Sequence, residues 1–323
     1  MSLAQLAVRF GPGRLEPLAP DASTRTFYRQ FLTSGQKRIV MCDPNGGVAA
    51  LDRLVAAQAL LASIEVPVPQ IYERDDALSA VVFEDFGDTL LADALSSLTP
   101  AACTAAYVEA ARIAARISTH GTAGLAQFPL LKQPILGAER LTFEMKFLLE
   151  HEFTHRRGIR DVALVAELDA ALQRLVERVA AYPRELAHRD FHARNLMYRP
   201  DGRLGVVDFQ DLLEAPPLYD LASLVRDPYV EPDEALANAT IQAYRAEAGL
   251  QASPSVDVRF AWVALERDLK AIGTYAYQAT RLGRTRFLNC IAPAERLVRK
   301  ALSEIGNDAN DLLDLLGAAG FFA

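Results

Sequence analysis

Two short motifs joined by a predicted hairpin place the strongest constraint on how this 323-residue chain can fold. The first motif, residues 188–195, reads HRDFHARN, and the second, residues 206–210, reads VVDFQ. Between them, two apolar runs flank a Pro-Asp-Gly turn signal at 200–202, which is the pattern of strand, tight turn and strand. Such a hairpin brings Asn195 and Asp208 to neighbouring strand ends at one edge of a cleft.

The residue types at these positions suit phosphoryl transfer. Magnesium, the usual companion of ATP, prefers hard oxygen ligands, and Asn195 and Asp208 offer an amide oxygen and a carboxylate. Asp190 is then available to accept a proton from an attacking hydroxyl or to orient it, as the aspartate of a kinase catalytic loop does. An HRD triplet alone is a weak signal, because its aspartate can simply cap a turn. Two motifs in this order predict a site that uses ATP and Mg²⁺.

The two motifs resemble those of the aminoglycoside phosphotransferase family, whose members are small-molecule kinases with a bilobal, protein-kinase-like fold. Three further segments are similar to one branch, the N-acetylmuramate/N-acetylglucosamine anomeric kinases of cell-wall recycling. They are residues 21–29 (DASTRTFYR), 219–227 (YDLASLVRD) and 269–273 (LKAIG). The resemblance implies an ATP-dependent sugar 1-kinase, which transfers phosphate to the anomeric hydroxyl of an amino sugar.

The order of predicted elements indicates an α+β fold of two lobes. Strand-like segments cluster early and helical segments late, with a polar, Gly-containing break at 84–88 between them. We therefore expect a small N-terminal antiparallel-sheet lobe at 1–87, which binds the nucleotide, and a larger, mainly helical C-terminal lobe at 88–323. The expected strands are 26–32, 37–42, 71–73 and 80–83, and the expected helices are 1–10, 51–64, 90–120, 139–156, 161–181 and several within 219–315.

The predicted nucleotide site departs from protein kinases at two places. The segment 19–27, which precedes the first predicted strand, has no glycine, but Ser23, Thr24 and Arg25 can donate hydrogen bonds to phosphate oxygens. An ordinary polar turn with a solvated Arg25 is the alternative. Met41 stands near the position of the usual strand lysine.

The cation that replaces this lysine stays open between Arg25, Arg29 and Lys37. The family resemblance also places the adenine ring against the predicted hinge. There the Glu84 carbonyl and the Phe86 amide are our candidates for hydrogen bonds to the base. A simple linker between lobes is the alternative for this segment.

Candidate acceptor-binding residues follow from position and from the resemblance. His192 lies inside the catalytic loop, Glu144 and Glu150 lie on a helix that borders the acceptor pocket in the family, and Arg226 could meet a substrate carboxylate. Each has a structural alternative: a packed histidine, a solvated helix face, or an arginine that caps helix carbonyls. We expect His188 and Asp220 to be structural.

Composition restricts the partners. The net charge is −7, with acidic and basic residues interspersed, which argues against a nucleic-acid partner. No apolar run is long enough to span a membrane, and the N-terminus lacks the pattern of a secretory signal. Three scattered cysteines suit reduced thiols, so we expect a cytoplasmic enzyme with a small-molecule sugar substrate; the oligomeric state is left open.

Two other functions remain open at this point. The acceptor of a kinase of this type can also be an aminoglycoside or another amino alcohol, although the C-terminal half has no conspicuous acidic run to bind a polycation. A non-catalytic nucleotide-binding protein is the second alternative. The missing lysine favours it, whereas the intact set of Asp190, Asn195 and Asp208 argues against it.

Overall fold

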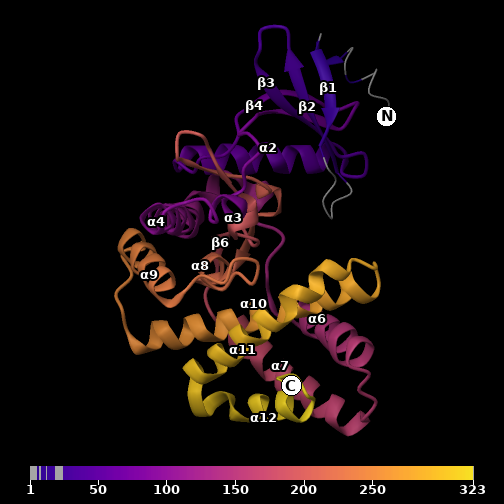
Figure 1. Cartoon of the computed structure of the whole chain (residues 1–323), viewed down its shortest axis with the longest axis vertical. Coiled ribbons are helices and arrows are strands. Elements are labelled where there is room, and N and C mark those ends of the chain that lie inside the picture. Colours follow the sequence, from indigo (N-terminus) through magenta and orange to yellow (C-terminus); the bar gives the residue numbers. More distant parts are fainter. Residues whose placement is uncertain (1–5, 7–8, 12, 19–24, 323) are drawn as a thin grey trace.

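The computed structural model describes residues 6, 9–11, 13–18 and 25–322 of the chain. Its N-terminal part contains a five-stranded antiparallel sheet in the order β1-β2-β3-β5-β4, drawn in indigo and purple in Figure 1. The strands are β1 (Gly13–Pro17), β2 (Thr26–Leu32), β3 (Lys37–Cys42), β4 (Ile71–Asp75) and β5 (Ala80–Glu84).

The four predicted strands of this sheet are confirmed, and β1 is an addition. Its sequence, GRLEP, begins with glycine and ends with proline, two residues that are depleted in strands. As the outer strand of the sheet it pairs only with β2, and an edge position is where a proline is tolerated. The predicted helix at 1–10 falls mostly outside the described residues.

Helix α2 (Gly47–Ser63) lies directly under the sheet in Figure 1 and joins the two parts of the molecule. Its buried side chains recur at helical spacing and include Leu54, Leu60 and Leu61. They share one apolar core with Met41 and Phe83 of the sheet and with buried residues of the later helices and the hairpin. One core therefore spans the sheet and the helices, and the sheet has in addition a smaller apolar cluster of its own.

Arg53 adds polar anchors between α2 and the rest of the chain. Its guanidinium donates to the backbone carbonyls of Leu130, Gln133 and Leu212, all of which follow the predicted hinge. The predicted boundary at residue 87 thus separates the strands of the five-stranded sheet from the later helices, but α2 is attached to both sides of it. The boundary itself stays a prediction.

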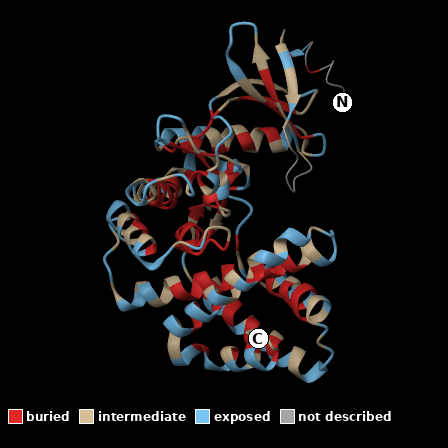
Figure 2. Cartoon of the chain, viewed as in Figure 1, coloured by how far each residue is buried: buried red, intermediate tan, exposed pale blue. Residues whose placement is uncertain are grey.

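The remainder of the chain is mainly helical, and most of its helices have both buried and exposed residues (Figure 2). A second apolar core contains Leu172, Leu265 and Val298 and packs the helices of the C-terminal end against one another. The helices are α3 (Leu91–Ala94), α4 (Pro100–Arg116), α5 (Thr122–Gly124), α6 (Ala138–Leu148), α7 (Val162–Ala180), α8 (Tyr219–Val225), α9 (Glu234–Ala248), α10 (Pro254–Thr280), α11 (Ile291–Ile305) and α12 (Asn310–Ala318).

Helix boundaries differ from the prediction where local signals interrupt the pattern. The expected helix at 90–120 is split, because Thr99 caps the N-terminus of α4 through its side chain and Pro100 occupies the first helical position. The expected helix at 139–156 is continuous, but its second half, Leu149–Arg156, is wound as a π-helix. None of the helices in the described part of the chain has the length and apolar character to cross a membrane.

The predicted hairpin is confirmed. Strands β7 (Leu196–Tyr198) and β8 (Leu204–Val206) pair antiparallel, with Leu196 opposite Val206. The turn is closed at Gly202, whose positive φ of 78° and backbone bond to Arg199 at 2.9 Å suit a glycine. A further antiparallel pair, β6 (Glu185–Ala187) and β9 (Leu213–Ala215), flanks the hairpin and was not predicted.

Candidate active site

The segment 188–195 lies between β6 and β7, and two buried carboxylates accept hydrogen bonds from its backbone. Asp220, in the first turn of α8, accepts hydrogen bonds from the backbone N–H groups of His188 at 2.6 Å and Arg189 at 3.0 Å. Asp227 accepts a bond from the N–H of Ala193 at 3.1 Å. Burial raises the pKa of Asp220 to about 6, an effect that the charge of His188 and the two N–H bonds only partly offset.

Other bonds tie this loop to the hairpin. The ring Nε2 of His188 donates to the carbonyl of Val207 at 3.0 Å, so His188 is structural, as predicted. The Asn195 side-chain amide donates to the carbonyl of Asp190 at 2.8 Å, and the N–H of Val207 donates to the carbonyl of Asn195 at 3.1 Å. The ends of the two motifs therefore lie side by side, in the arrangement that the hairpin predicted.

Asp190, Asn195 and Asp208 line one cavity of about 360 Å³, together with His192. Asp208 has a positive φ of 63°, a conformation in which aspartate is one of the more tolerated side chains. Gln210, at the position where protein kinases have glycine, donates its side-chain amide to the Asp208 carboxylate at 2.5 Å. The departure from the kinase motif thus adds a bond that orients Asp208.

A second cavity, of about 390 Å³, lies between the sheet and the hairpin. Its walls are mostly apolar, and the hinge segment with Glu84 and Phe86 forms one side. The apolar side chains are Leu18, Phe27, Ile39, Met41, Leu54, Pro69, Phe83, Phe86, Met197, Val207 and Phe209. Asn195 and Asp208 line this cavity as well as the first one, so the two cavities meet at the predicted metal ligands.

Two arginines hold the hinge against its neighbours. Arg29 on β2 donates to the Asp85 carboxylate at 2.6 Å and to the carbonyl of Gly87 at 3.0 Å, and it also pairs with Asp88. The guanidinium of Arg199 lies 4.5 Å from the centre of the Phe86 ring. Arg29 is therefore engaged at the hinge, which lowers its availability for phosphate oxygens.

The other candidates for phosphate contact give a divided result. Ser23 and Thr24 lie outside the described residues. Arg25 pairs with Asp43 at 3.1 Å. Lys37 is exposed and lies opposite Phe31, at one end of the β2–β3 pair. Met41 lies opposite Phe27, near the other end, so Lys37 does not stand where the usual lysine would.

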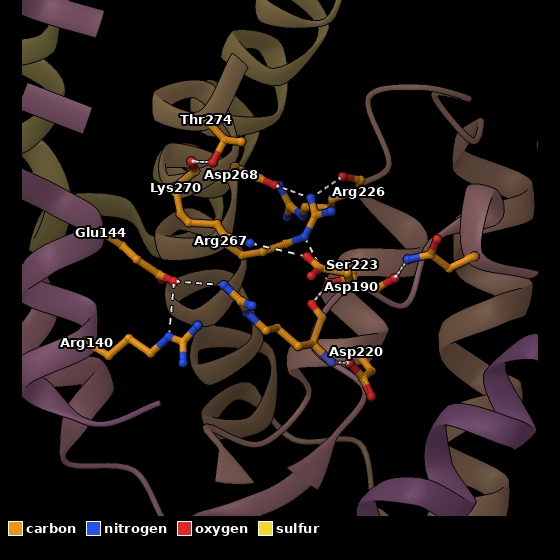
Figure 3. Close-up of polar contacts among 12 residues, drawn as sticks. Arg140, Glu144, Asp190, Asp220, Ser223, Arg226, Arg267, Asp268, Lys270 and Thr274 are labelled. Carbon is orange, nitrogen blue, oxygen red and sulfur yellow. Dashed lines mark hydrogen bonds and ion pairs between the residues drawn. The ribbon is translucent and has the colours of Figure 1, made fainter. Parts of the chain in front are cut away.

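A lysine from the helical part approaches the catalytic loop instead. Nζ of Lys270 on α10 lies 3.3 Å from Oδ1 of Asp190 (Figure 3). Burial alone would raise the pKa of Asp190, but the charges of Lys270 and Arg189 outweigh burial and lower it well below its ordinary value. Asp190 is consequently ionised at neutral pH and has an oxygen that can accept a proton from a hydroxyl.

Of the predicted acceptor-binding residues, His192 reaches the cavity with Asp190, and its ring packs against Tyr229 at 5.6 Å. The other three do not line that cavity. Glu144 is buried and lies 3.8 Å from both Arg140 and Arg189 (Figure 3). Glu150 is exposed and lies 3.4 Å from His155.

Arg226 is buried behind the catalytic loop. It donates to the carbonyl of Leu297 at 3.0 Å and to Glu304 of α11. Its side chain is 3% exposed. The structure therefore gives Arg226 a bridging role between α8 and α11, through a carbonyl of α11 rather than those of its own helix, and leaves it outside the cavity that contains Asp190.

The wall of the acceptor-side cavity comes mostly from residues that sequence reasoning missed. They are Arg194 and Tyr229, then Thr274, Tyr275 and Gln278 of α10, then Arg286, Phe287 and Cys290 of the 3₁₀ segment Thr285–Cys290. Tyr275 is buried and also lines this cavity. A polar stripe at 270, 274 and 278, four residues apart in the mostly apolar second half of the helix, was the available signal.

Comparison with known proteins agrees with this geometry. The family model described as the phosphotransferase enzyme family matches residues 14–254. The N-acetylmuramate/N-acetylglucosamine kinase of Pseudomonas aeruginosa is 27% identical over 298 residues, which cover 90% of this chain and 85% of the relative. The kinase of the same name from Neisseria meningitidis is 28% identical, with 93% and 90% covered.

Solved structures show the same fold at lower identity. The ADP-bound aminoglycoside phosphotransferase APH(2'')-Ib superposes with a TM-score of 0.64 at 14% identity, covering 94% of this chain and 97% of that one. The choline kinase LicA from Streptococcus pneumoniae gives a TM-score of 0.63 at 15% identity, covering 93% and 98%. The bilobal, kinase-like α+β fold is thereby confirmed.

Proposed function

The chain belongs to the phosphotransferase enzyme family, and from this premise we propose that it transfers the γ-phosphoryl group of ATP to the anomeric hydroxyl of N-acetylmuramate or N-acetylglucosamine. The observation that carries the proposal is the meeting of two cavities at Asn195 and Asp208. One cavity is apolar and suits a nucleotide base; the other is polar and contains Asp190. Such an enzyme would serve cell-wall sugar recycling.

The nucleotide side of the reaction uses the hinge cavity. Its apolar walls suit a flat base, and the segment with Glu84 and Phe86 lies at one side, where backbone groups can meet the base edge. Asn195 and Asp208 fit magnesium, because both offer oxygen atoms and both face the two cavities. A bound Mg²⁺ would screen the negative charge of the phosphates.

The acceptor side uses Asp190. One carboxylate oxygen accepts the proton of the attacking hydroxyl, whose oxygen forms a bond to the γ-phosphorus while the bond between that phosphorus and the β,γ-bridging oxygen breaks. His192 lies in the same cavity and can contact the acceptor. The backbone bonds from Asp220 and Asp227 keep this loop in place during the transfer.

The charge of the acceptor cavity separates the possible acceptors. Among the described residues that line it, the acids are Asp190 and Asp208, whereas Arg194 and Arg286 contribute positive charge. Aromatic rings of Tyr229, Tyr275 and Phe287 complete its wall. A polycationic aminoglycoside would meet two guanidinium groups there. A neutral sugar, or a sugar with a carboxylate such as the lactyl group of N-acetylmuramate, fits better.

An acceptor panel tests the proposal. The purified chain is incubated with ATP and Mg²⁺ and with N-acetylmuramate, N-acetylglucosamine, kanamycin or choline, and ADP release is followed. We expect release that depends on the amino sugars and is lost in an Asp190→Asn variant. The sugar product should also lose its reducing end, because phosphorylation of the anomeric hydroxyl blocks ring opening.

Three outcomes would contradict the proposal in different ways. Phosphorylation of kanamycin or choline without the sugars would move the enzyme to another acceptor class. A phosphorylated sugar that keeps its reducing end would move the site of transfer to another hydroxyl. Nucleotide binding without acceptor-dependent ADP release would support a non-catalytic protein.

A further inference from the structure

We propose that Lys270 is a positioning residue for phosphoryl transfer, which holds Oδ1 of the Asp190 carboxylate so that Oδ2 is presented to the acceptor hydroxyl. The inference rests on the role that the proposed function gives to Asp190. Its basis is the 3.3 Å contact between Nζ of Lys270 and Oδ1 of Asp190, which joins α10 to the catalytic loop across 80 residues of sequence (Figure 3).

The position of Lys270 on α10 follows from helical geometry. Residues four apart lie on the same face of a helix, so Lys270, Thr274 and Gln278 form one stripe. Thr274 and Gln278 line the acceptor cavity. Lys270 stands at the end of this stripe next to the catalytic loop, where it can reach Asp190 and remain beside the acceptor.

The pair is shielded from water more than a surface ion pair. The side chain of Lys270 is 17% exposed and that of Asp190 is 40% exposed. Exposed ion pairs hold their side chains weakly, because water screens the charges and both chains lose rotamer freedom. Partial burial strengthens the attraction, so this lysine can fix the orientation of the carboxylate.

A buried acid on the same helix favours the pairing of Lys270 with Asp190. Glu266, one helical turn before Lys270, is fully buried, and its carboxyl group lies against that of Glu144. Burial and the nearby Glu144 raise the pKa of Glu266 well above its ordinary value, against the opposing charge of Lys270. A neutral Glu266 does not compete strongly for the ammonium group, which leaves Asp190 as its partner.

Among the described residues, the sheet side of the cleft supplies no lysine to the Asp190 carboxylate. Met41 lines the nucleotide cavity near the position of the usual strand lysine, and Arg29 is engaged by Asp85 and Asp88. Among the described residues, Lys270 is the lysine that contacts the Asp190 carboxylate. The ammonium group beside the reacting hydroxyl is thus supplied by the helical lobe.

The first test compares three variants. Lys270→Met removes the charge and keeps most of the length; Lys270→Arg keeps the charge; Lys146→Met changes a lysine on α6 that is 56% exposed and pairs with Asp169. We expect Lys270→Met to lower kcat about 10- to 100-fold, the size expected for a lost hydrogen bond to a charged group. KM for ATP should stay near the wild-type value. Lys270→Arg should retain more activity, and Lys146→Met should match the wild type.

The decisive measurement combines Lys270→Met with Asp190→Asn. If Lys270 acts through the Asp190 carboxylate, its replacement should cost little further kcat once that carboxylate is gone. A purely structural lysine would lower kcat by the same factor in both backgrounds. Equal loss in both backgrounds, or a Lys270→Met enzyme with wild-type kcat, would overturn the inference.

A folding failure of Lys270→Met would be detected by its thermal unfolding and by ADP binding. In that case Lys270→Ala is assayed with added ethylammonium, which should restore kcat in proportion to its concentration if the missing cation is the cause. No restoration would count against the proposal. If the wild type phosphorylates no acceptor, the proposed function fails and this inference falls with it; if only the Lys270 variants behave like the wild type, this inference alone fails.

Discussion

The two cavities that meet at Asn195 and Asp208 are similar in size but are built in opposite ways. The nucleotide cavity is walled by apolar side chains of the sheet, the hinge and the hairpin. The acceptor cavity is walled by polar and aromatic side chains, half of them from α10 and the 3₁₀ segment Thr285–Cys290. Under the proposed function, a nucleotide would be held mainly by shape, and the acceptor would be selected mainly by charge and hydrogen bonds. Four substitutions would break or sharpen this contrast.

The largest effect is expected at Asp190, the group through which the acceptor cavity does chemistry. Asp190→Asn keeps the size of the side chain but removes the oxygen that accepts the proton. We expect kcat to fall by about 10² to 10⁴, the usual contribution of a general base, with KM for ATP little changed. Steady-state kinetics with saturating sugar measures this. A variant with wild-type kcat would remove Asp190 from its assigned role.

A steric change tests the nucleotide cavity next. A Cβ atom on Gly205 would lie 2.3 Å from Cδ2 of Phe86, so Gly205→Ala must displace the hinge ring. We expect the free energy of unfolding to drop by about 1 to 3 kcal/mol, as for other overpacked sites, and KM for ATP to rise with no change in acceptor preference.

Gly137→Ala is the matched control for this change, because its Cβ would meet no atom closer than 3.8 Å. Denaturant unfolding and ATP titration of both variants measure the two effects. An acceptor preference that shifts in Gly205→Ala would show that the two cavities are not independent in function.

A smaller, selective effect is expected at Arg286 in the acceptor cavity. If this guanidinium contributes to binding of an acidic sugar, Arg286→Ala should raise KM for N-acetylmuramate about 10-fold, the cost of one charge-assisted bond. KM for N-acetylglucosamine, which lacks the carboxylate, serves as the internal control and should change little. An equal rise for both sugars would argue for a packing role of Arg286.

The smallest effect is expected at Lys37, which lies on the sheet but away from the nucleotide cavity. It is exposed, and its Nζ lies 5.6 Å from the centre of the Phe31 ring. Lys37→Ala should leave KM for ATP within about twofold of the wild type, as for most surface changes. A large rise in this KM would indicate that Lys37 contacts the phosphates. It would then argue against nucleotide binding that depends mainly on shape.

The same contrast explains which parts of the site could be predicted from the sequence. Asp190, Asn195 and Asp208 belong to two motifs joined by the hairpin of β7 and β8, whose turn chemistry and alternation are local properties. The hinge with Glu84 and Phe86 also follows directly from the last strand of the sheet. Local pattern was therefore sufficient to bring Asp190, Asn195 and Asp208 to one cavity, whereas the nucleotide contacts of Glu84 and Phe86 came from the family resemblance and stay predictions.

The acceptor side depends on tertiary packing that no local pattern contains. Lys270 and Tyr275 lie in a long helix where most neighbours are buried, so a core role was the natural interpretation of Tyr275. Glu144 and Arg226 were chosen for their charge, but the structure buries both against charges of opposite sign that come from distant segments. The packing of the helices decides which buried charges form ion pairs, and these pairs cannot be predicted from the local sequence.

The attachment of helix α2 has a consequence for how the cleft opens. The helix precedes the hinge in sequence, yet Arg53 bonds it to carbonyls that follow the hinge, and its apolar face packs against both the sheet and later segments. Because Arg53 donates to three carbonyls beyond the hinge, we expect α2 to move together with the helical lobe. Only the sheet would then tilt, with the chain between β3 and α2 and the chain between α2 and β4 acting as its joints. ATP would then enter by a tilt of the five-stranded sheet, and the acceptor cavity would keep its shape.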